Sequence, residues 1–256
     1  MSRNDAQIWL KGIDMDGTIR NLARLATLGA MLVGAFATAQ AADLPVYKKA
    51  PPPVEAWNPW MIRLRVLGVL PDGGDSTVNV AGVPALSSPN SGLDISNQVV
   101  PELDISYFFT PNIAAELILG VTRHHITGTG TLQGLDIGKT TLLPPTLTLQ
   151  YHFTNFGAFK PYIGAGVNYT VFFNNSASNT AFGGLAVTNL HVSNAWGGAV
   201  QFGFDYMFDK HWGVNVDVKK LWLQPNYSAT VNGAIPVTGT AHIDPWLVGA
   251  GVTYKF

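Results

Sequence analysis

Apolar side chains recur at every second position over most of the chain, from Trp60 to its end. In the last run, Trp246, Val248, Ala250, Val252, Tyr254 and Phe256 alternate with Leu247, Gly249, Gly251, Thr253 and Lys255. A repeat of two is the period of a β-strand, in which successive side chains point to opposite faces. Eight such runs predict strands over residues 62–67, 102–109, 115–122, 147–153, 163–171, 196–208, 212–219 and 246–256.

The two faces of these runs differ from those of a soluble sheet. The polar face carries mostly Gly, Thr, Asn and Gln, and few of the charged residues that cover a solvated surface. Aromatic residues gather at the strand ends, as they do at the interfaces of a membrane barrel. They are Phe109, Tyr151, Phe153, Tyr162, Tyr206, Phe208, Trp212, Tyr254 and Phe256 at one rim, and Tyr169, Trp196, Trp222 and Trp246 toward the other.

These patterns predict an all-β fold, an eight-stranded antiparallel transmembrane β-barrel with its apolar face in lipid. The strands should close on one another, because an open sheet would leave unpaired backbone groups in hydrocarbon. A soluble barrel of the lipocalin type, with its apolar face inward, is the alternative.

The lengths of the connections predict an orientation. Residues 110–112, 154–160 and 209–211 are short links. Four connections are long and rich in Gly, Asn, Ser and Thr, over residues 71–97, 123–143, 173–194 and 225–244. Because outer-membrane barrels have short periplasmic turns and longer extracellular loops, we expect the second set to be extracellular loops and both termini to be periplasmic.

The N-terminal region predicts export. Residues 25–37 form an apolar stretch after Arg20 and Arg24, and small residues follow at 39–41 (Ala-Gln-Ala). This is the pattern of a cleaved secretory signal, and its apolar core is too short to span a bilayer. We therefore predict a signal peptide over residues 1–41. A buried N-terminal helix of a soluble protein is the alternative.

The remaining segments complete the expected organisation. A start at Met15 would give a signal of normal proportions, because the stretch before Arg20 is long for a signal peptide. Residues 42–56 hold four prolines and predict an extended periplasmic lead-in. Residues 57–256 form the predicted outer-membrane β-barrel.

Composition narrows the class further. Charged residues make up 12% of the chain, against about 25% in ordinary soluble domains. The formal net charge of −1, without a basic cluster, argues against a nucleic-acid partner. The chain has no cysteine, which excludes disulfides, thiolate metal sites and cysteine nucleophiles. A helical membrane protein would need repeated runs of about 20 apolar residues, which the chain lacks. No metal site or cofactor is predicted.

Four segments carry a family resemblance: residues 60–65 (WMIRLR), 159–169 (FKPYIGAGVNY), 215–220 (NVDVKK) and 244–256 (DPWLVGAGVTYKF). Together they resemble the OmpW family of small outer-membrane barrels, over nearly the whole expected mature chain. The resemblance implies a monomeric eight-stranded barrel that passes small hydrophobic molecules across the outer membrane. The Pro-rich lead-in is not a general feature of that family.

An eight-stranded barrel is just wide enough inside for side chains or one small ligand, so a water-filled porin is not expected. Charged residues occupy inward positions in the middle and lower lumen, where opposite charges must pair. They are Arg63, Arg65, Glu102, Asp104, Glu116, Asp205, Asp217, Lys219 and Lys255. We predict that they form a plug that blocks straight passage to the periplasm. A purely structural brace is the alternative for each of them.

Above the plug, the inward positions become apolar, at Leu67, Val69, Leu221, Leu223 and Leu247. This predicts a hydrophobic vestibule, although simple packing beneath the loops is the alternative. Because proline removes ladder hydrogen bonds, Pro71, Pro101 and residues 144–145 mark places where the wall is expected to be weak. An apolar solute would enter from outside, meet the plug and leave sideways through the wall.

Catalysis and a role of the loops are the alternatives to transport. No catalytic residues are predicted, because no nucleophile motif surrounds the loop serines. Those serines are Ser87, Ser88, Ser176 and Ser178. His124 and His125 point to opposite faces of a strand, which argues against a shared metal site. A structural or receptor role of the extracellular loops, without transport, is the second function that the sequence allows.

The expected partners follow from this interpretation. They are outer-membrane lipid, small hydrophobic solutes and, through the C-terminal Phe256, the machinery that assembles barrels in the outer membrane of Gram-negative bacteria. No nucleic acid is expected, and the protein is expected to be a monomer.

The signal peptide gives the first testable prediction. Protein purified from outer membranes should begin at Ala42, because the small residues at 39 and 41 are those that a signal peptidase reads. Mass spectrometry of the intact exported protein measures this directly. An exported chain that still carries Met1 would contradict the prediction.

Overall fold

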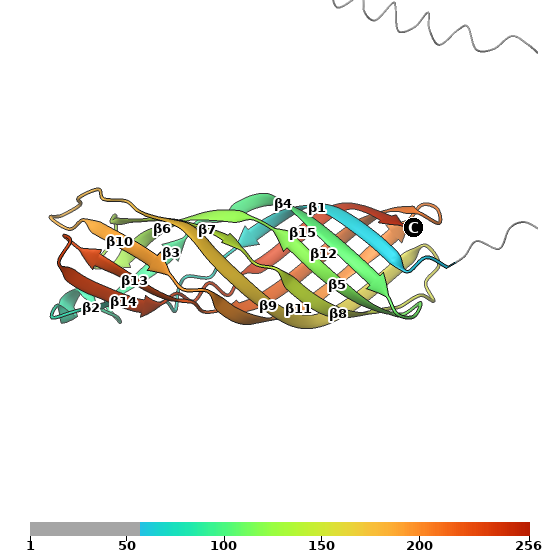
Figure 1. Ribbon diagram of the computed structural model, residues 1–256, viewed down its shortest axis with the longest axis horizontal. Coiled ribbons are helices and arrows are strands. Elements are labelled where there is room, and N and C mark those ends of the chain that lie inside the picture. The colour runs from blue at the N-terminus through green and yellow to red at the C-terminus, as the bar shows by residue number, and fades with distance from the viewer. Residues whose placement is uncertain (1–56) are drawn as a thin grey trace, which may run out of the picture. The chain divides into compact units, whose positions relative to one another are not determined.

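The computed structural model describes residues 57–256, so the predicted signal peptide and Pro-rich lead-in lie outside the described residues. Within that part, eight antiparallel strands form a closed barrel (Figure 1). They are β1 (Trp60–Leu70), β4 (Gln98–Phe108), β5 (Ile113–Gly120), β8 (Thr146–His152), β9 (Phe159–Ala177), β11 (Ala195–Met207), β12 (Trp212–Leu223) and β15 (Trp246–Lys255). Each strand pairs with the next, and β15 pairs with β1 to close the ring. Each predicted run overlaps one of these strands, and the predicted barrel is confirmed.

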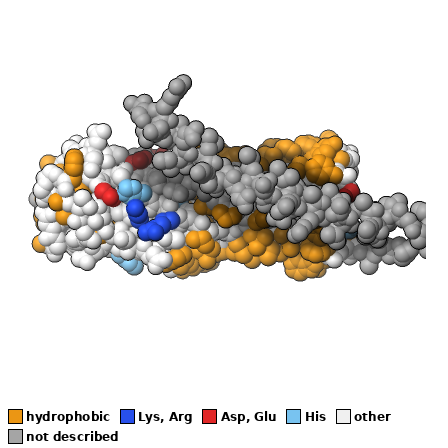
Figure 2. All heavy atoms as spheres, turned by 90° about the horizontal axis from the view of Figure 1, so that it is seen from above, with side chains coloured by type: hydrophobic (Ala, Val, Ile, Leu, Met, Phe, Trp, Pro, Cys, Tyr) orange, Lys and Arg blue, Asp and Glu red, His pale blue; other side chains and the backbone are white. Residues whose placement is uncertain are grey.

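The apolar face of the barrel points outward. In β1, Leu64 and Val66 are 55% and 64% exposed, whereas Arg63 and Arg65 are buried in the lumen. Figure 2 shows apolar side chains over much of the outer surface of the barrel. An apolar exterior around a polar interior is the arrangement of a lipid-facing wall, and it is the opposite of a soluble barrel.

The long connections, predicted as extracellular loops, are instead mostly β-structure. They contain β2 (Asn79–Val80), the 3₁₀ helix η2 (Pro84–Leu86), β3 (Ser91–Ile95), β6 (Thr122–Gly130), β7 (Asp136–Leu143), β10 (Val187–Val192), β13 (Asn226–Val231) and β14 (Ile235–Thr240). Strand β7 pairs with the C-terminal part of β9, β6 pairs with β7, and β3 pairs with β6. Strands β10, β13, β14 and β2 form a second sheet. We call this part the extension. It lengthens the barrel at the end opposite the C-terminus (Figure 1).

The extension encloses an apolar core of its own, with Leu93, Ile137, Phe172 and Leu190 among its buried residues. Its strands point apolar residues inward and polar residues outward. In β13, for example, the side chain of Tyr227 is buried and that of Asn226 is exposed. This polarity is the reverse of that in the barrel strands. The sequence interpretation missed these strands because most are short and their outward Thr, Ser and Asn residues suggest loops.

Short irregular segments separate the barrel strands from the extension. The wall is interrupted at Val121 between β5 and β6, at residues 144–145 between β7 and β8, and at residues 224–225 between β12 and β13. Strand β9 runs through both parts without a break, over 19 residues. Across residues 57–256, no helix is long and apolar enough to cross a membrane.

The seam between β1 and β15 gives a prediction for folding. A Cβ atom at Gly251 would lie 2.0 Å from the Leu64 carbonyl oxygen and 2.6 Å from the Arg65 Cα atom, so the backbone would have to move. We expect Gly251→Ala to lower the free energy of unfolding by about 1–3 kcal/mol, because overpacking of this kind distorts its surroundings. Urea unfolding in lipid vesicles, followed by tryptophan fluorescence, measures the change.

The matched control is Gly249→Ala in the same strand. The atoms nearest to its added Cβ are side-chain atoms of Leu67 and Arg65, at 3.2 Å and 3.4 Å, and the Val66 carbonyl oxygen lies at 3.6 Å. The carbonyl oxygen is thus in ordinary van der Waals contact, whereas the one at Gly251 overlaps with the added atom. Equal losses of stability at the two positions would contradict the prediction.

Candidate functional site

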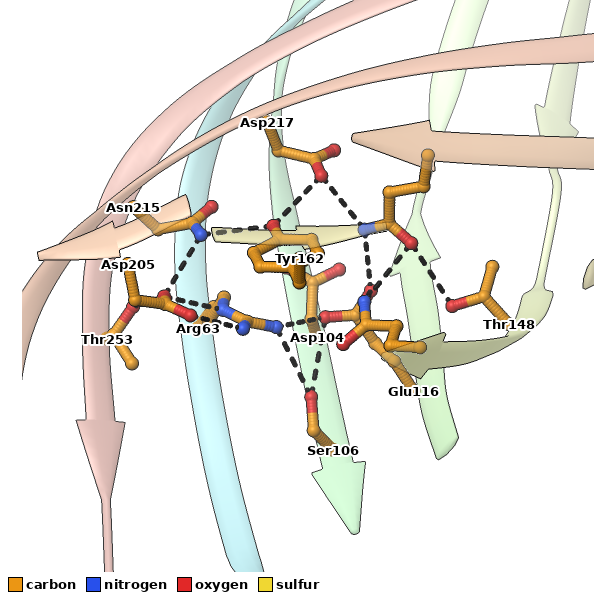
Figure 3. A network of polar contacts seen from close by, with 12 residues as sticks. Arg63, Asp104, Ser106, Glu116, Thr148, Tyr162, Asp205, Asn215, Asp217 and Thr253 are labelled. Carbon is orange, nitrogen blue, oxygen red and sulfur yellow. Dashed lines mark hydrogen bonds and ion pairs between the residues drawn. The ribbon is translucent and has the colours of Figure 1, made fainter. Parts of the chain in front are cut away.

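The lumen is crossed by ion pairs that begin at two inward positions of β1. Arg63 makes a two-point contact with Asp205, with Nε donating to Oδ1 at 2.9 Å and Nη2 to Oδ2 at 2.6 Å. Its third nitrogen, Nη1, pairs with Glu116 from β5. One arginine therefore joins β5 to β11 on the other side of the barrel (Figure 3).

Arg65, two positions further along β1, organises the second half of the site. Its Nε lies 2.9 Å from Glu102 Oε1, and its Nη2 lies 2.5 Å from Asp104 Oδ2. Lys219 bridges Glu102 and Asp217, at 2.8 Å and 2.7 Å. These contacts bring together eight of the nine charged residues that the sequence placed in the lumen. We call the eight the charge network: Arg63, Arg65, Glu102, Asp104, Glu116, Asp205, Asp217 and Lys219.

Neutral polar side chains link the two halves of the charge network. Gln201 Nε2 donates to Glu116 Oε2 at 2.8 Å and to Asp217 Oδ2 at 2.9 Å. Gln150 donates to the same Glu116 oxygen at 2.6 Å, and the Tyr162 hydroxyl donates to Asp217 Oδ2 at 2.9 Å. Sequence reasoning did not single out Gln150 and Gln201. Tyr162 was expected in the aromatic rim, and that placement was wrong, because its side chain is fully buried in the lumen. The signal that marks all three is a large polar side chain at an inward strand position.

Lys255 is the charged residue that the structure leaves outside the network. It lies near the end of β15, and its ammonium group sits 4.8 Å from the centre of the Phe108 ring. There it borders an open cavity of about 350 Å³ at the C-terminal end of the lumen. Two positions earlier in β15, Thr253 does reach the network and donates to Asp205 Oδ1 at 2.7 Å.

The charge network is tightly buried. It contains five carboxyl groups and three cationic side chains, and Arg63, Asp104 and Glu116 have no exposed surface. Removing one partner of a buried ion pair costs about 3–5 kcal/mol, because the other charge is left without compensation. Displacing these side chains would therefore be costly for an uncharged solute.

An apolar cavity lies next to the charge network. Four of the five predicted vestibule residues, Leu67, Val69, Leu221 and Leu247, form one buried apolar cluster together with Ala199. The fifth, Leu223, packs in the core of the extension and also lines this cavity. We call the apolar cavity beside the charge network the lower cavity. It has a volume of about 40 Å³, and Glu102 and Lys219 of the charge network also line it.

Two more apolar cavities continue from the lower cavity into the extension, each of about 30 Å³. The middle cavity shares His124, Leu142 and Ile243 with the lower one. The outer cavity shares Leu93, Ile137 and Tyr227 with the middle one. The three cavities therefore lie in a row, separated by shared side chains. Most residues of the middle and outer cavities were not predicted, because their segments were expected to be loops.

The wall beside the lower cavity contains a stretch without strand pairing. On the side facing β5 and β6, the pairing of β4 ends at Glu102, opposite Gly120. Pairing with β6 resumes only where the backbone nitrogen of Ser96 donates to the His125 carbonyl at 3.0 Å. Residues 98–101 and 121–124 thus face each other without ladder hydrogen bonds in the described structure. We call this opening in the ladder the slot.

Both edges of the slot contribute to the lower cavity. Val100 comes from β4, and Gly120 and Thr122 come from the other edge. On the outside, Val99 and Val121 are 72% and 52% exposed. The slot therefore separates an apolar cavity from the apolar outer surface of the barrel.

The other predicted weak points of the wall are bridged by hydrogen bonds. At residues 144–145, the Asn168 side chain donates to both proline carbonyls, and the Tyr169 nitrogen donates to the carbonyl of Pro145. Just after Pro71, the nitrogen of Asp72 donates to the Ile243 carbonyl at 2.8 Å. Pro101 is the predicted position that borders the slot.

The residues weighed for catalysis lie apart from the charge network. His124 is buried, whereas His125 is half-exposed on the outer face and contacts Asp136 at 2.7 Å. The hydroxyl groups of Ser87 and Ser88 hydrogen-bond to the backbone around Val78, Val80 and Val83. Among the residues that the structure describes, no group of three or more His, Cys, Asp and Glu side chains is arranged to hold a metal ion.

A closed barrel with an apolar exterior and a polar lumen defines an outer-membrane β-barrel protein. Residues 59–256 match the model of the OmpW family, and the chain belongs to that family. The resemblance predicted from the sequence and the outer-membrane location are thereby confirmed.

Three relatives illustrate the range of similarity. The chain is 50% identical over 257 residues to the uncharacterized outer-membrane protein y4mB of Sinorhizobium fredii, with 100% of each chain covered. It is 28% identical over 214 residues to the dibenzothiophene metabolism operon protein PahQ of Pseudomonas aeruginosa, covering 83% of this chain and 95% of that protein. The crystal structure of the outer membrane protein OprG from Pseudomonas aeruginosa superposes with a TM-score of 0.68 at 27% identity, covering 77% and 95% of the two chains.

The charge network gives a prediction for stability. Arg65→Leu removes the cation that pairs with Asp104, a residue with no exposed surface. We expect the free energy of unfolding to fall by about 3–5 kcal/mol. Urea unfolding in lipid vesicles measures it. Lys255→Leu, outside the network, is the control and should change the free energy by less than about 1 kcal/mol. A loss for Arg65→Leu as small as that of the control would contradict the prediction.

Proposed function

We propose that the protein passes small hydrophobic molecules from the cell exterior into the outer membrane. A solute enters through the extension, crosses the row of apolar cavities and leaves sideways through the slot. The observation that carries this proposal is the position of the lower cavity, which is bounded by the charge network below and by both edges of the slot at its side.

The charge network acts in this proposal as the barrier to straight passage. An apolar solute moving down the lumen would have to separate Arg63 and Arg65 from their carboxylates without offering replacement hydrogen bonds. The sideways route carries no such penalty, because the outer surface of the slot is made by Val99, Pro101 and Val121 and faces lipid. Each methylene group that passes from water to an apolar environment gains about 0.8 kcal/mol, so hydrocarbon is a favourable destination.

The size of the cavities sets a condition on this route. The three volumes, between about 30 and 40 Å³, are well below the roughly 150 Å³ of an engineered protein cavity that binds benzene. Passage therefore requires the side chains between the cavities to move. The slot beside the lower cavity supports such movement, because no ladder hydrogen bonds hold the two facing segments together there.

The chemistry suggested by one relative agrees with an apolar solute. PahQ takes its name from a dibenzothiophene metabolism operon, and dibenzothiophene is an uncharged polycyclic aromatic compound. The solutes proposed for this chain are therefore uncharged apolar molecules as a class.

The orientation follows from the same proposal. The extension faces the exterior, and the C-terminal end, with its short turns, faces the periplasm. We also propose that the protein works as a monomer, since one chain supplies the cavities, the charge network and the slot. Phe256 is exposed at the periplasmic end, where it is available to the barrel-assembly machinery.

A cross-link across the slot tests the route. The chain has no cysteine, so Val99→Cys and Val121→Cys together provide a unique pair of thiols at the outer edges of the slot. A reducible bifunctional thiol reagent should lower the uptake of naphthalene to the rate of protein-free vesicles, and reduction should restore it. The vesicles need an outer leaflet of lipopolysaccharide, because a plain phospholipid bilayer does not hold back apolar solutes.

The control places the same cross-link at an intact part of the wall. Val214 of β12 and Val252 of β15 are register partners on the outer face. Linking cysteines at these two positions should leave the uptake rate unchanged. Uptake that continues with the slot cross-linked would exclude the slot as the exit, and the absence of uptake by the native protein would exclude transport.

A further inference from the structure

His124 sits where the slot ends and strand pairing resumes. Its ring points into the barrel and is 2% exposed. The imidazole contacts both sides of the opening, with Nδ1 2.6 Å from the Ser96 carbonyl oxygen and Nε2 2.5 Å from the Thr122 hydroxyl. Ser96 precedes β4, and Thr122 belongs to β6. The ring therefore connects the two chain segments at the point where the wall closes.

The protonation of the ring follows from its partners. In the neutral form of the imidazole, one ring nitrogen donates a hydrogen bond and the other accepts one. Because a carbonyl only accepts, Nδ1 carries the proton and Nε2 accepts from the Thr122 hydroxyl. Both ring nitrogens are satisfied, and the ring is held in one orientation.

The same ring stands between two of the apolar cavities. It lines the middle cavity and the lower cavity together with Leu142 and Ile243. Those two side chains are held by packing alone, whereas the imidazole is held by two directional hydrogen bonds. A solute that passes from the middle to the lower cavity has to move past these three shared side chains.

We propose that His124 is the gate between the middle and lower cavities and the latch at the upper end of the slot. Its ring sets the size of the solute that reaches the slot, and its hydrogen bonds to Ser96 and Thr122 set how readily the gate opens. This inference rests on the proposed function, and it assigns the selectivity of that route to one side chain.

Two substitutions separate the ring from its hydrogen bonds. His124→Phe keeps a ring of similar size but loses both contacts, so the uptake rates of naphthalene and of pyrene should both rise. His124→Ala also removes the ring, and it should raise the rate for the larger pyrene by about tenfold more than that for naphthalene. The rates are measured by the fluorescence of the two solutes in the lipopolysaccharide-containing vesicles described above. His125→Ala, on the outer face of the same strand, is the matched control and should behave like the native protein.

The outcomes distinguish the gate from the route. Native uptake that is blocked by the slot cross-link, with both His124 variants at native rates and native selectivity, would overturn the gate and leave the proposed function intact. If the native protein does not take up either solute, or if the slot cross-link has no effect, the proposed function itself fails.

A second measurement keeps the proposal testable if the variants do not fold. In native protein labelled with ¹⁵N-histidine in lipid bilayers, the Nδ1 proton of His124 should show the signal of a strong hydrogen bond to a carbonyl. Added naphthalene should shift that signal and leave the signal of His125 in place. A His124 signal that naphthalene does not change would overturn the gate.

Discussion

The medium around the barrel changes from hydrocarbon to water along its axis, and the polarity of the wall reverses with it. In the barrel strands, Leu64 and Val66 face lipid while Arg63 and Arg65 face the lumen. In the extension, Tyr227 faces inward and Asn226 outward. An alternating strand has one apolar and one polar face, so a polar lumen in the membrane and an apolar interior above it follow from where the outer solvent changes.

The candidate site lies where the barrel strands meet the extension. Below the junction, polar side chains in a narrow lumen must satisfy one another, which produces the charge network around Arg63 and Arg65. Above it, apolar side chains fill the interior and leave only small cavities. Most strands cannot keep one regular ladder through the change, and short breaks appear. The slot beside Pro101 is one such break, and it lies between the lower cavity and the apolar outer surface of the barrel.

Much of the barrel could be predicted, because the alternation of apolar and polar residues is visible within each strand's own sequence. The alternation in each of the eight runs identified the strands, and the inward positions identified eight members of the charge network. The extension was not predicted, since strands as short as β2 and β14 carry too few apolar residues to show a period. Leu223 was placed in the vestibule but also packs in the core of the extension. Lys255 lies against the Phe108 ring, and Thr253 is the residue of β15 that contacts Asp205. Gln150 and Gln201 were missed, and Tyr162 was assigned to the aromatic rim, because an inward polar residue does not reveal its partner.

The alternating residue pattern was enough to derive the period of the strands, the closed barrel that follows from it and the kind of side chain on each face. These properties depend on neighbouring residues and on the cost of unpaired backbone in hydrocarbon. Three features emerged only once the chain was folded: residues 98–101 and 121–124 face each other without pairing, three cavities lie in a row, and the His124 ring contacts both Ser96 and Thr122. These features depend on the register between segments that are distant in sequence, and no local pattern encodes that register.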